Sequence, residues 1–90
     1  MKFYEVEVKV WLKKSVFDPQ GNAVEHALTG LGYEGVDKVR IGKYMQLLVE
    51  ATDEAAAHDK VKSICDKVLH NPVMETYSYT LIEAAAEVSV

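Results

Sequence analysis

The chain has 90 residues, of which 49% are hydrophobic and 27% charged, a composition typical of one globular domain and far from that of disordered proteins. Its 14 acidic and 10 basic residues give a net charge of −4, the wrong sign for a nucleic-acid-binding protein, which needs clustered Lys and Arg. The single cysteine permits no internal disulfide and the N-terminal residues contain no apolar signal segment, so we expect a cytoplasmic protein.

Residues 2–12 alternate apolar and polar side chains, which is the period of a half-buried β-strand. The set expected to face the core is Tyr4, Val6, Val8, Val10 and Leu12. The opposite face is mostly charged but also carries Phe3 and Trp11. These two aromatic side chains either lie along neighbouring strands or contact another subunit, because large aromatics are enriched at the centres of interfaces.

The next segment predicts a helix with Asp18 as its N-cap and Pro19 at its first position, where a missing N–H is not required. Gly32 supplies the left-handed residue that ends this helix. Gly21, in the first turn, leaves room for another backbone to approach closely. Apolar residues at helical spacing predict one buried stripe, formed by Val24, Ala27, Leu28 and Leu31.

Residues 37–50, with the sequence DKVRIGKYMQLLVE, alternate like a strand but contain Gly42 and Lys43 in the middle. We favour two strands joined by a tight turn at residues 42–44, which pairs Ile41 with the next apolar residue and keeps all apolar side chains on one face. The alternative is one long strand bent at Gly42, which directs Lys43 inward and implies an intertwined dimer.

Residues 52–69 predict a second helix, capped by Thr52 or Asp53 and stopped by Asn71 and Pro72. Its expected buried stripe consists of Ala57, Val61, Ile64, Cys65 and Val68.

Residues 73–83 alternate again and predict the last strand, while residues 84–90 predict a frayed C-terminal tail beyond a single domain of residues 1–83. The predicted order is β-α-β-β-α-β; in the alternative, the two middle strands are one long bent strand. This order predicts an α+β two-layer sandwich of ferredoxin-like type, an antiparallel sheet with two helices on one face. A domain this small buries a modest share of its surface, which favours a homodimer or higher homo-oligomer.

Residue types that could carry chemistry are sparse. His26, His58 and His70 show none of the spacings of a metal site. Cys65 falls in an apolar helical stripe with no histidine nearby in the sequence to activate it. The chain also contains neither of the glycine-rich loop motifs that hold nucleotide phosphates. The residues themselves therefore predict no catalytic, cofactor-binding or metal site.

Four stretches, in order over residues 2–83, resemble the PurS family, the small subunit of phosphoribosylformylglycinamidine (FGAM) synthase. They are LKKSVFDPQG, ALTGLGY, VRIGKY and NPVMETY. Each is weak alone, and their common order and spacing make the resemblance specific.

The resemblance implies a non-catalytic bridging subunit in purine biosynthesis, which docks a glutaminase subunit (PurQ) to an ATP-dependent synthetase subunit (PurL) and helps to transfer ammonia. It further implies that ATP and Mg²⁺ are used by the synthetase and that this chain holds no cofactor, although the whole complex is a glutamine-hydrolysing C–N ligase. The alternative function is a ferredoxin-like regulatory module that senses a small molecule.

Eight positions match the motifs of the family: Asp18, Pro19, Gly21, Arg40, Gly42, Lys43, Asn71 and Pro72. The two X-Pro pairs have sufficient local explanations as helix start and helix stop. Arg40 and Lys43 have no such explanation, so we expect them, with Gly42 and Trp11, to contact a partner subunit. The competing interpretation is a solvated turn whose lysine resists aggregation.

Overall fold

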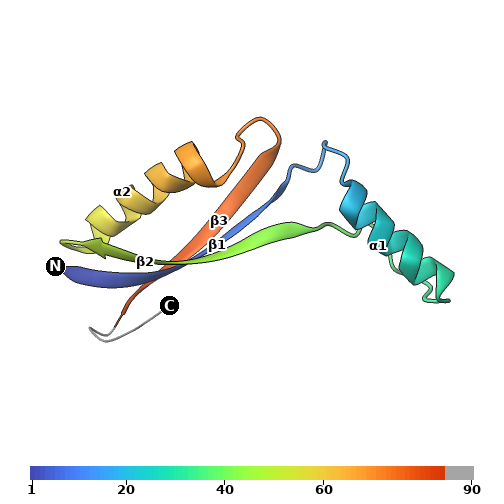
Figure 1. Ribbon diagram of the computed structural model, residues 1–90, viewed down its shortest axis with the longest axis horizontal. Coiled ribbons are helices and arrows are strands. Elements are labelled where there is room, and N and C mark those ends of the chain that lie inside the picture. Colours follow the sequence, from blue (N-terminus) through green and yellow to red (C-terminus); the bar gives the residue numbers. More distant parts are fainter. Residues whose placement is uncertain (85–90) are drawn as a thin grey trace.

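The computed structural model describes residues 1–84 and contains three strands and two α-helices (Figure 1). In chain order the elements are β1 (Lys2–Leu12), α1 (Pro19–Gly30), β2 (Gly42–Ala51), α2 (Glu54–Ile64), the π-helical segment Cys65–Leu69, and β3 (Glu75–Glu83). No helix within the described residues has the length and apolar character needed to cross a membrane.

The three strands form one antiparallel sheet in the order β2-β1-β3. The centre of the register is Val8, which lies opposite Met45 on one side and Tyr79 on the other. The alternation predicted for β1 is confirmed: its inward side chains from Tyr4 to Val10 are at most 1% exposed. The predicted α+β class with an antiparallel sheet is likewise confirmed.

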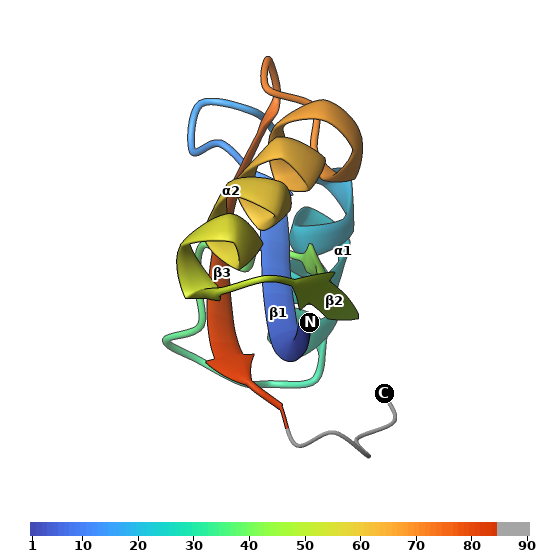
Figure 2. The same ribbon diagram turned by 90° about the vertical axis from the view of Figure 1, so that its left-hand side faces the viewer.

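The core lies between this inward face and α2, which runs along one side of the sheet (Figures 1 and 2). Ala57, Val61 and Cys65 of the predicted stripe are fully buried there. Val68 is 75% exposed, contrary to the prediction. The reason is the π-helical segment, whose wider turn changes the angular position of the residues that follow Cys65.

Helix α1 differs from the prediction of two helices over one face, because it extends past the end of the sheet and leaves α2 as the one cover (Figure 1). The molecule is accordingly elongated, with extents of 52 × 29 × 16 Å. Its predicted buried stripe is open within the single chain, since Val24 is 40% and Leu31 76% exposed. An amphipathic stripe indicates that a helix packs on something, and it does not specify which surface.

The predicted pair of middle strands is a single strand in the structure. Residues 42–44 are its first residues and do not form a turn, while Val39 and Ile41 precede it outside the sheet. Their backbone N–H groups donate to side chains at α1: Val39 N to Glu25 Oε1 at 3.3 Å and Ile41 N to Asp18 Oδ2 at 2.8 Å. These two N–H groups are therefore not free to donate to a neighbouring strand.

The frayed tail predicted for residues 84–90 lies outside the described residues, except for Ala84. Its N–H donates to the Phe3 carbonyl at 2.8 Å, so this first tail residue is still attached to the sheet.

Candidate interaction surface

Nearly all the residues singled out in the sequence meet at one place, where the sheet ends and α1 begins. We call this place the junction and define it as residues 13–18, the first turn of α1, residues 38–43 and residues 70–75. Trp11 borders it from β1, opposite Gly42. Gly32 does not belong to it, since it follows the far end of α1, where its φ of 91° ends the helix as predicted.

Asp18 is the most buried polar side chain of the junction, at 4% exposure. As predicted it caps α1, accepting the Gly21 N–H at 2.8 Å through Oδ1, while Oδ2 accepts the Ile41 N–H at 2.8 Å. These hydrogen bonds, the one from Ile41 first, hold the pKa of Asp18 below its usual range. One carboxylate thus fixes the start of α1 to the approach to β2.

Position 21 must be glycine because the backbone of Val39 passes close to it, as the sequence suggested for another backbone segment. A Cβ at this position would lie 2.1 Å from the carbonyl oxygen of Val39, a distance that no side chain tolerates. Gly42 is constrained in the same way, because its Cβ would lie 2.5 Å from the Val10 carbonyl oxygen. Both glycines of the family motifs therefore serve backbone contact inside the chain.

Arg40 has a local role that sequence reasoning missed. Its Nη2 donates to the carbonyl oxygens of Lys13 and Val16, each at 2.8 Å, and more weakly to that of Leu12 at 3.4 Å. The guanidinium thereby holds the loop between β1 and α1 in shape. The sequence does not show which loop carbonyl groups lack a hydrogen-bond donor in the folded chain. This role of Arg40 could therefore not be predicted from the residues.

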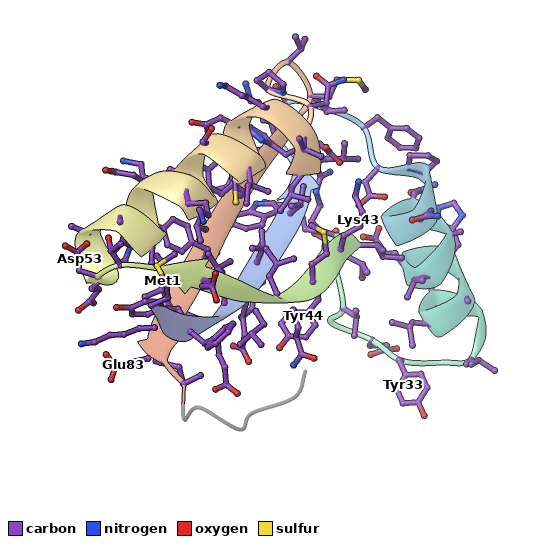
Figure 3. The ribbon with its side chains drawn as sticks, turned by 60° about the vertical axis from the view of Figure 1, so that its left-hand side comes forward. Met1, Tyr33, Lys43, Tyr44, Asp53 and Glu83 are labelled. Carbon is purple, nitrogen blue, oxygen red and sulfur yellow. The ribbon has the colours of Figure 1, made fainter. Side chains whose placement is uncertain are left out.

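Lys43 lies where β2 approaches α1 (Figure 3). Its Nζ is 3.5 Å from Glu75 Oε2, and the lysine side chain remains 62% exposed. Glu75 Oε1 accepts the Asn71 N–H at 2.8 Å, a bond that, ahead of the lysine charge, lowers the pKa of Glu75. Lys13 Nζ donates to the Pro72 carbonyl at 2.8 Å. Residues 71 and 72 are therefore held within the junction by two hydrogen bonds, one to Glu75 and one from Lys13.

Exposed apolar side chains surround the junction and α1. They are Phe17, Val24, Leu31, Tyr33 and Val36, with Val68, Val73 and Met74 near the end of α2. Tyr33 points away from the rest of the molecule (Figure 3). So many large apolar groups on a small chain are typical of a surface that another protein covers.

The remaining titratable groups form small local clusters. Nδ1 of His58 is 2.8 Å from the Tyr79 hydroxyl, and Nδ1 of His70 is 2.6 Å from the Cys65 carbonyl oxygen. The Tyr77 hydroxyl donates to Asp66, which together with burial raises the pKa of Tyr77 to about 12. Burial also raises the pKa of the Cys65 thiol, which disfavours the reactive thiolate.

Among residues 1–84, no three His, Cys, Asp or Glu side chains gather so that they could hold a metal ion. What the described geometry offers is a rigid junction surrounded by exposed apolar and charged side chains, which suits contact with other proteins.

Comparisons with known proteins give a consistent result. Residues 5–83 match the family model described as PurS, phosphoribosylformylglycinamidine (FGAM) synthase. The PurS subunit of Bacillus subtilis is 49% identical over 84 residues, covering 93% of this chain and 99% of the relative, and that of Synechocystis is 46% identical, covering 91% and 84%. A chain in the structure of PurLQS from Thermotoga maritima has a TM-score of 0.83 at 33% identity, covering 91% of this chain and 100% of that one.

Proposed function

The chain belongs to the PurS family of phosphoribosylformylglycinamidine synthase, and from this membership we propose that it is the bridging subunit of that enzyme in purine biosynthesis. In this role it docks a glutaminase subunit to an ATP-dependent synthetase subunit and contributes no catalytic residue of its own. The observation that carries the proposal is the similarity, along 91% of the chain, to a chain of the PurLQS structure.

The transfer of ammonia between two active sites explains why the complex needs a bridging subunit. A glutaminase releases ammonia, which must reach the synthetase before bulk water protonates it and removes its lone pair. A subunit that holds the two active sites together shortens that path. ATP and Mg²⁺ act in the synthetase, and this chain takes no cofactor. The one thiol of the chain, Cys65, is buried where α2 passes into the π-helical segment, which agrees with a role outside catalysis.

We further propose that the chain works as a homodimer or higher homo-oligomer in the cytoplasm, with α1 packed on a second copy. The support is the open stripe of α1: Leu31 is 76% exposed in a chain whose own sheet lies out of reach of the helix. A helix stabilised mainly by tertiary packing needs a surface for this stripe. An intertwined dimer followed only from the alternative of one long bent strand, and packing α1 on a second copy exchanges a helix between subunits in place of that strand.

We assign contact with the partner subunits to the rim of the junction, formed by Trp11, which is 37% exposed, and by the exposed Lys43 side chain beside Gly42. The two side chains lie on opposite faces of the sheet, because Lys43 pairs with the inward Val10 and Trp11 pairs with Gly42. Arg40 supports this rim from within through its bonds to loop carbonyls. Its replacement should therefore alter the shape of the contact surface as well as its charge.

The experiment is assembly from the three purified components. We expect the affinity-tagged synthetase to retain the glutaminase when this chain is present and to lose it when the chain is left out. Lys43→Ala should weaken retention while Lys2→Ala, a change at the opposite end of the sheet, should not. Retention of the glutaminase without the chain contradicts the bridging role.

A further inference from the structure

A hollow of about 540 Å³ lies on the α1 side of the junction, between the loop that follows β1 and the segment that leads into β2. Both of these segments reach α1 past the end of the sheet (Figure 1). The lining of the hollow includes Lys14, Phe17, Asn22, Glu25, Lys38 and Arg40. Its volume is that of a small-molecule pocket and exceeds what a single small ion fills.

The acidic groups of the hollow are already occupied by backbone donors. Asp18 accepts the Gly21 N–H through one oxygen and the Ile41 N–H through the other, each at 2.8 Å. Glu25 Oε1 accepts the Val39 N–H at 3.3 Å. Within residues 1–84 neither carboxylate takes part in an ion pair. These two groups therefore connect parts of the chain and do not neutralise the lysines beside them.

The basic groups of the hollow, by contrast, are available to a ligand. In the described part of the chain, neither Lys14 nor Lys38 forms an ion pair. Arg40 adds a third positive charge, held in place by the bonds from its Nη2 to the loop carbonyls. The unpaired charge in the hollow is therefore positive, on a chain whose net charge is −4, and it attracts an anion.

Lys38 is held in a backbone conformation that residues with a side chain rarely adopt. Its φ of 54° is positive, and the Asp37 carboxylate stabilises this turn by accepting the Lys38 N–H at 2.8 Å. Strained positions of this kind recur at ligand-binding sites, where the surrounding structure fixes a residue in place. Here the strained residue is one of the unpaired lysines that line the hollow.

Phe17 gives the hollow an aromatic wall. It is 69% exposed, although it directly precedes Asp18, the most buried polar residue of the junction. Planar bases stack on exposed aromatic side chains, and ammonium groups pair strongly with phosphate oxygens. An aromatic ring beside unpaired lysines therefore suits a ligand that joins a planar base to a phosphate.

We infer that this hollow binds a nucleoside monophosphate, with the phosphate between Lys14 and Lys38 and the base against Phe17. The phosphate is held by side chains, so the site needs no glycine-rich loop. The lining contains no thiol, hydroxyl or imidazole group, so the ligand is bound without being transformed and acts as an effector. Because it contacts both segments that Asp18 joins, its binding stabilises the junction.

The hollow is separate from the surfaces assigned to other subunits. Asn22, which lines it, lies on the side of α1 opposite Val24 and Leu31, since successive helical residues are turned by 100°. Neither Trp11 nor Lys43 of the rim belongs to its lining. A nucleotide can therefore occupy the hollow while α1 and the rim keep their contacts.

Calorimetric titration of the purified full chain with three probes tests the site. The probes are adenosine monophosphate (AMP), adenosine and inorganic phosphate. We expect AMP to bind more tightly than either of its parts, because it alone uses both the aromatic wall and the lysines. The melting temperature should rise with the concentration of AMP, since a ligand that binds the folded chain stabilises it.

Charge-removing variants locate the phosphate. Lys14→Gln and Lys38→Asn should each raise the dissociation constant for AMP about tenfold, and asparagine is chosen because it tolerates a positive φ. Lys62→Gln is the matched control, since this lysine of α2 lies outside the hollow, and it should leave the dissociation constant unchanged. Phe17→Ala should weaken the binding of AMP and leave that of inorganic phosphate unaltered.

Several results would overturn the inference. One is the absence of both binding heat and a rise in melting temperature at millimolar AMP. Another is adenosine that binds as tightly as AMP, which would show that the lysines do not hold a phosphate. A third is a pair of lysine variants that bind AMP like the wild type but no longer join the synthetase and glutaminase, which would assign these lysines to an acidic partner surface. The titrations use this chain alone, so their failure leaves the bridging role untouched.

Discussion

The carboxylate of Asp18 joins the start of α1 to the approach to β2, which makes this residue the clearest single test of the junction. Asp53 is a matched control because it caps α2 with one bond, to the Ala56 N–H at 2.8 Å. Asp53→Ala should lower the free energy of unfolding by about 1 kcal/mol, as for an ordinary N-cap. Asp18→Ala should lower it more, because the Ile41 N–H loses its acceptor as well. Urea unfolding of both variants measures the difference.

The pKa of Asp18 gives a second, pH-dependent test. Because folding lowers this pKa, the charged carboxylate contributes stability that is complete above its unfolded-state pKa, about 4, and is lost as the pH falls through the lower folded pKa. The difference in unfolding free energy between wild type and Asp18→Asn should therefore be constant near neutral pH and shrink below about pH 4. A difference that grows in acid would contradict this account of the site.

Alanine substitutions at two glycines of α1 distinguish the effect of a close backbone contact on stability from the effect of helix propensity. Gly21→Ala places a methyl group against the Val39 carbonyl and should destabilise the fold by about 1–3 kcal/mol. Gly30→Ala meets nothing within 4 Å and should stabilise it by up to about 1 kcal/mol. Thermal unfolding of the two variants provides the comparison, and equal effects would show that Gly21 does not support the junction.

At the scale of elements, the strands were more predictable than the helix positions. The period of β1 identifies its buried face because alternation in a strand leaves no other choice. The caps at Asp18 and Gly32 were likewise readable, since local backbone geometry dictates those residue types. Val39 and Ile41 looked like a strand, but their N–H groups donate to Glu25 and Asp18, which are distant in sequence.

The sequence predicted which residues belong to the candidate site better than it predicted what each of them does. The motif residues do meet at one junction, but the bonds of Arg40 to three loop carbonyls depend on the folded shape of that loop. The contact assignments of Trp11, Arg40, Gly42 and Lys43 stay predictions.

Helix α1 provides a prediction at this scale. Leu31→Glu should leave the single chain folded, because Leu31 is 76% exposed there, and should raise the dissociation constant of the homo-oligomer about tenfold or more. His26→Glu, on the opposite side of the same helix, is the control and should have little effect. Sedimentation velocity distinguishes the two, and identical behaviour would remove α1 from the interface.

At the scale of the whole molecule, the chain is elongated and leaves the stripe of α1 and the rim of the junction exposed. A chain of 90 residues with this much surface left for other proteins is suited to holding larger subunits in place. The central claim is that this chain connects two active sites and contains neither.

Reconstituted synthesis with two nitrogen sources tests that claim most directly. The synthetase and glutaminase are assayed with and without this chain, once with glutamine and once with added ammonium salt. We predict that the chain raises the glutamine-dependent rate and leaves the ammonium-dependent rate nearly unchanged, because free ammonia needs no bridge. Equal glutamine-dependent rates with and without the chain would contradict the account.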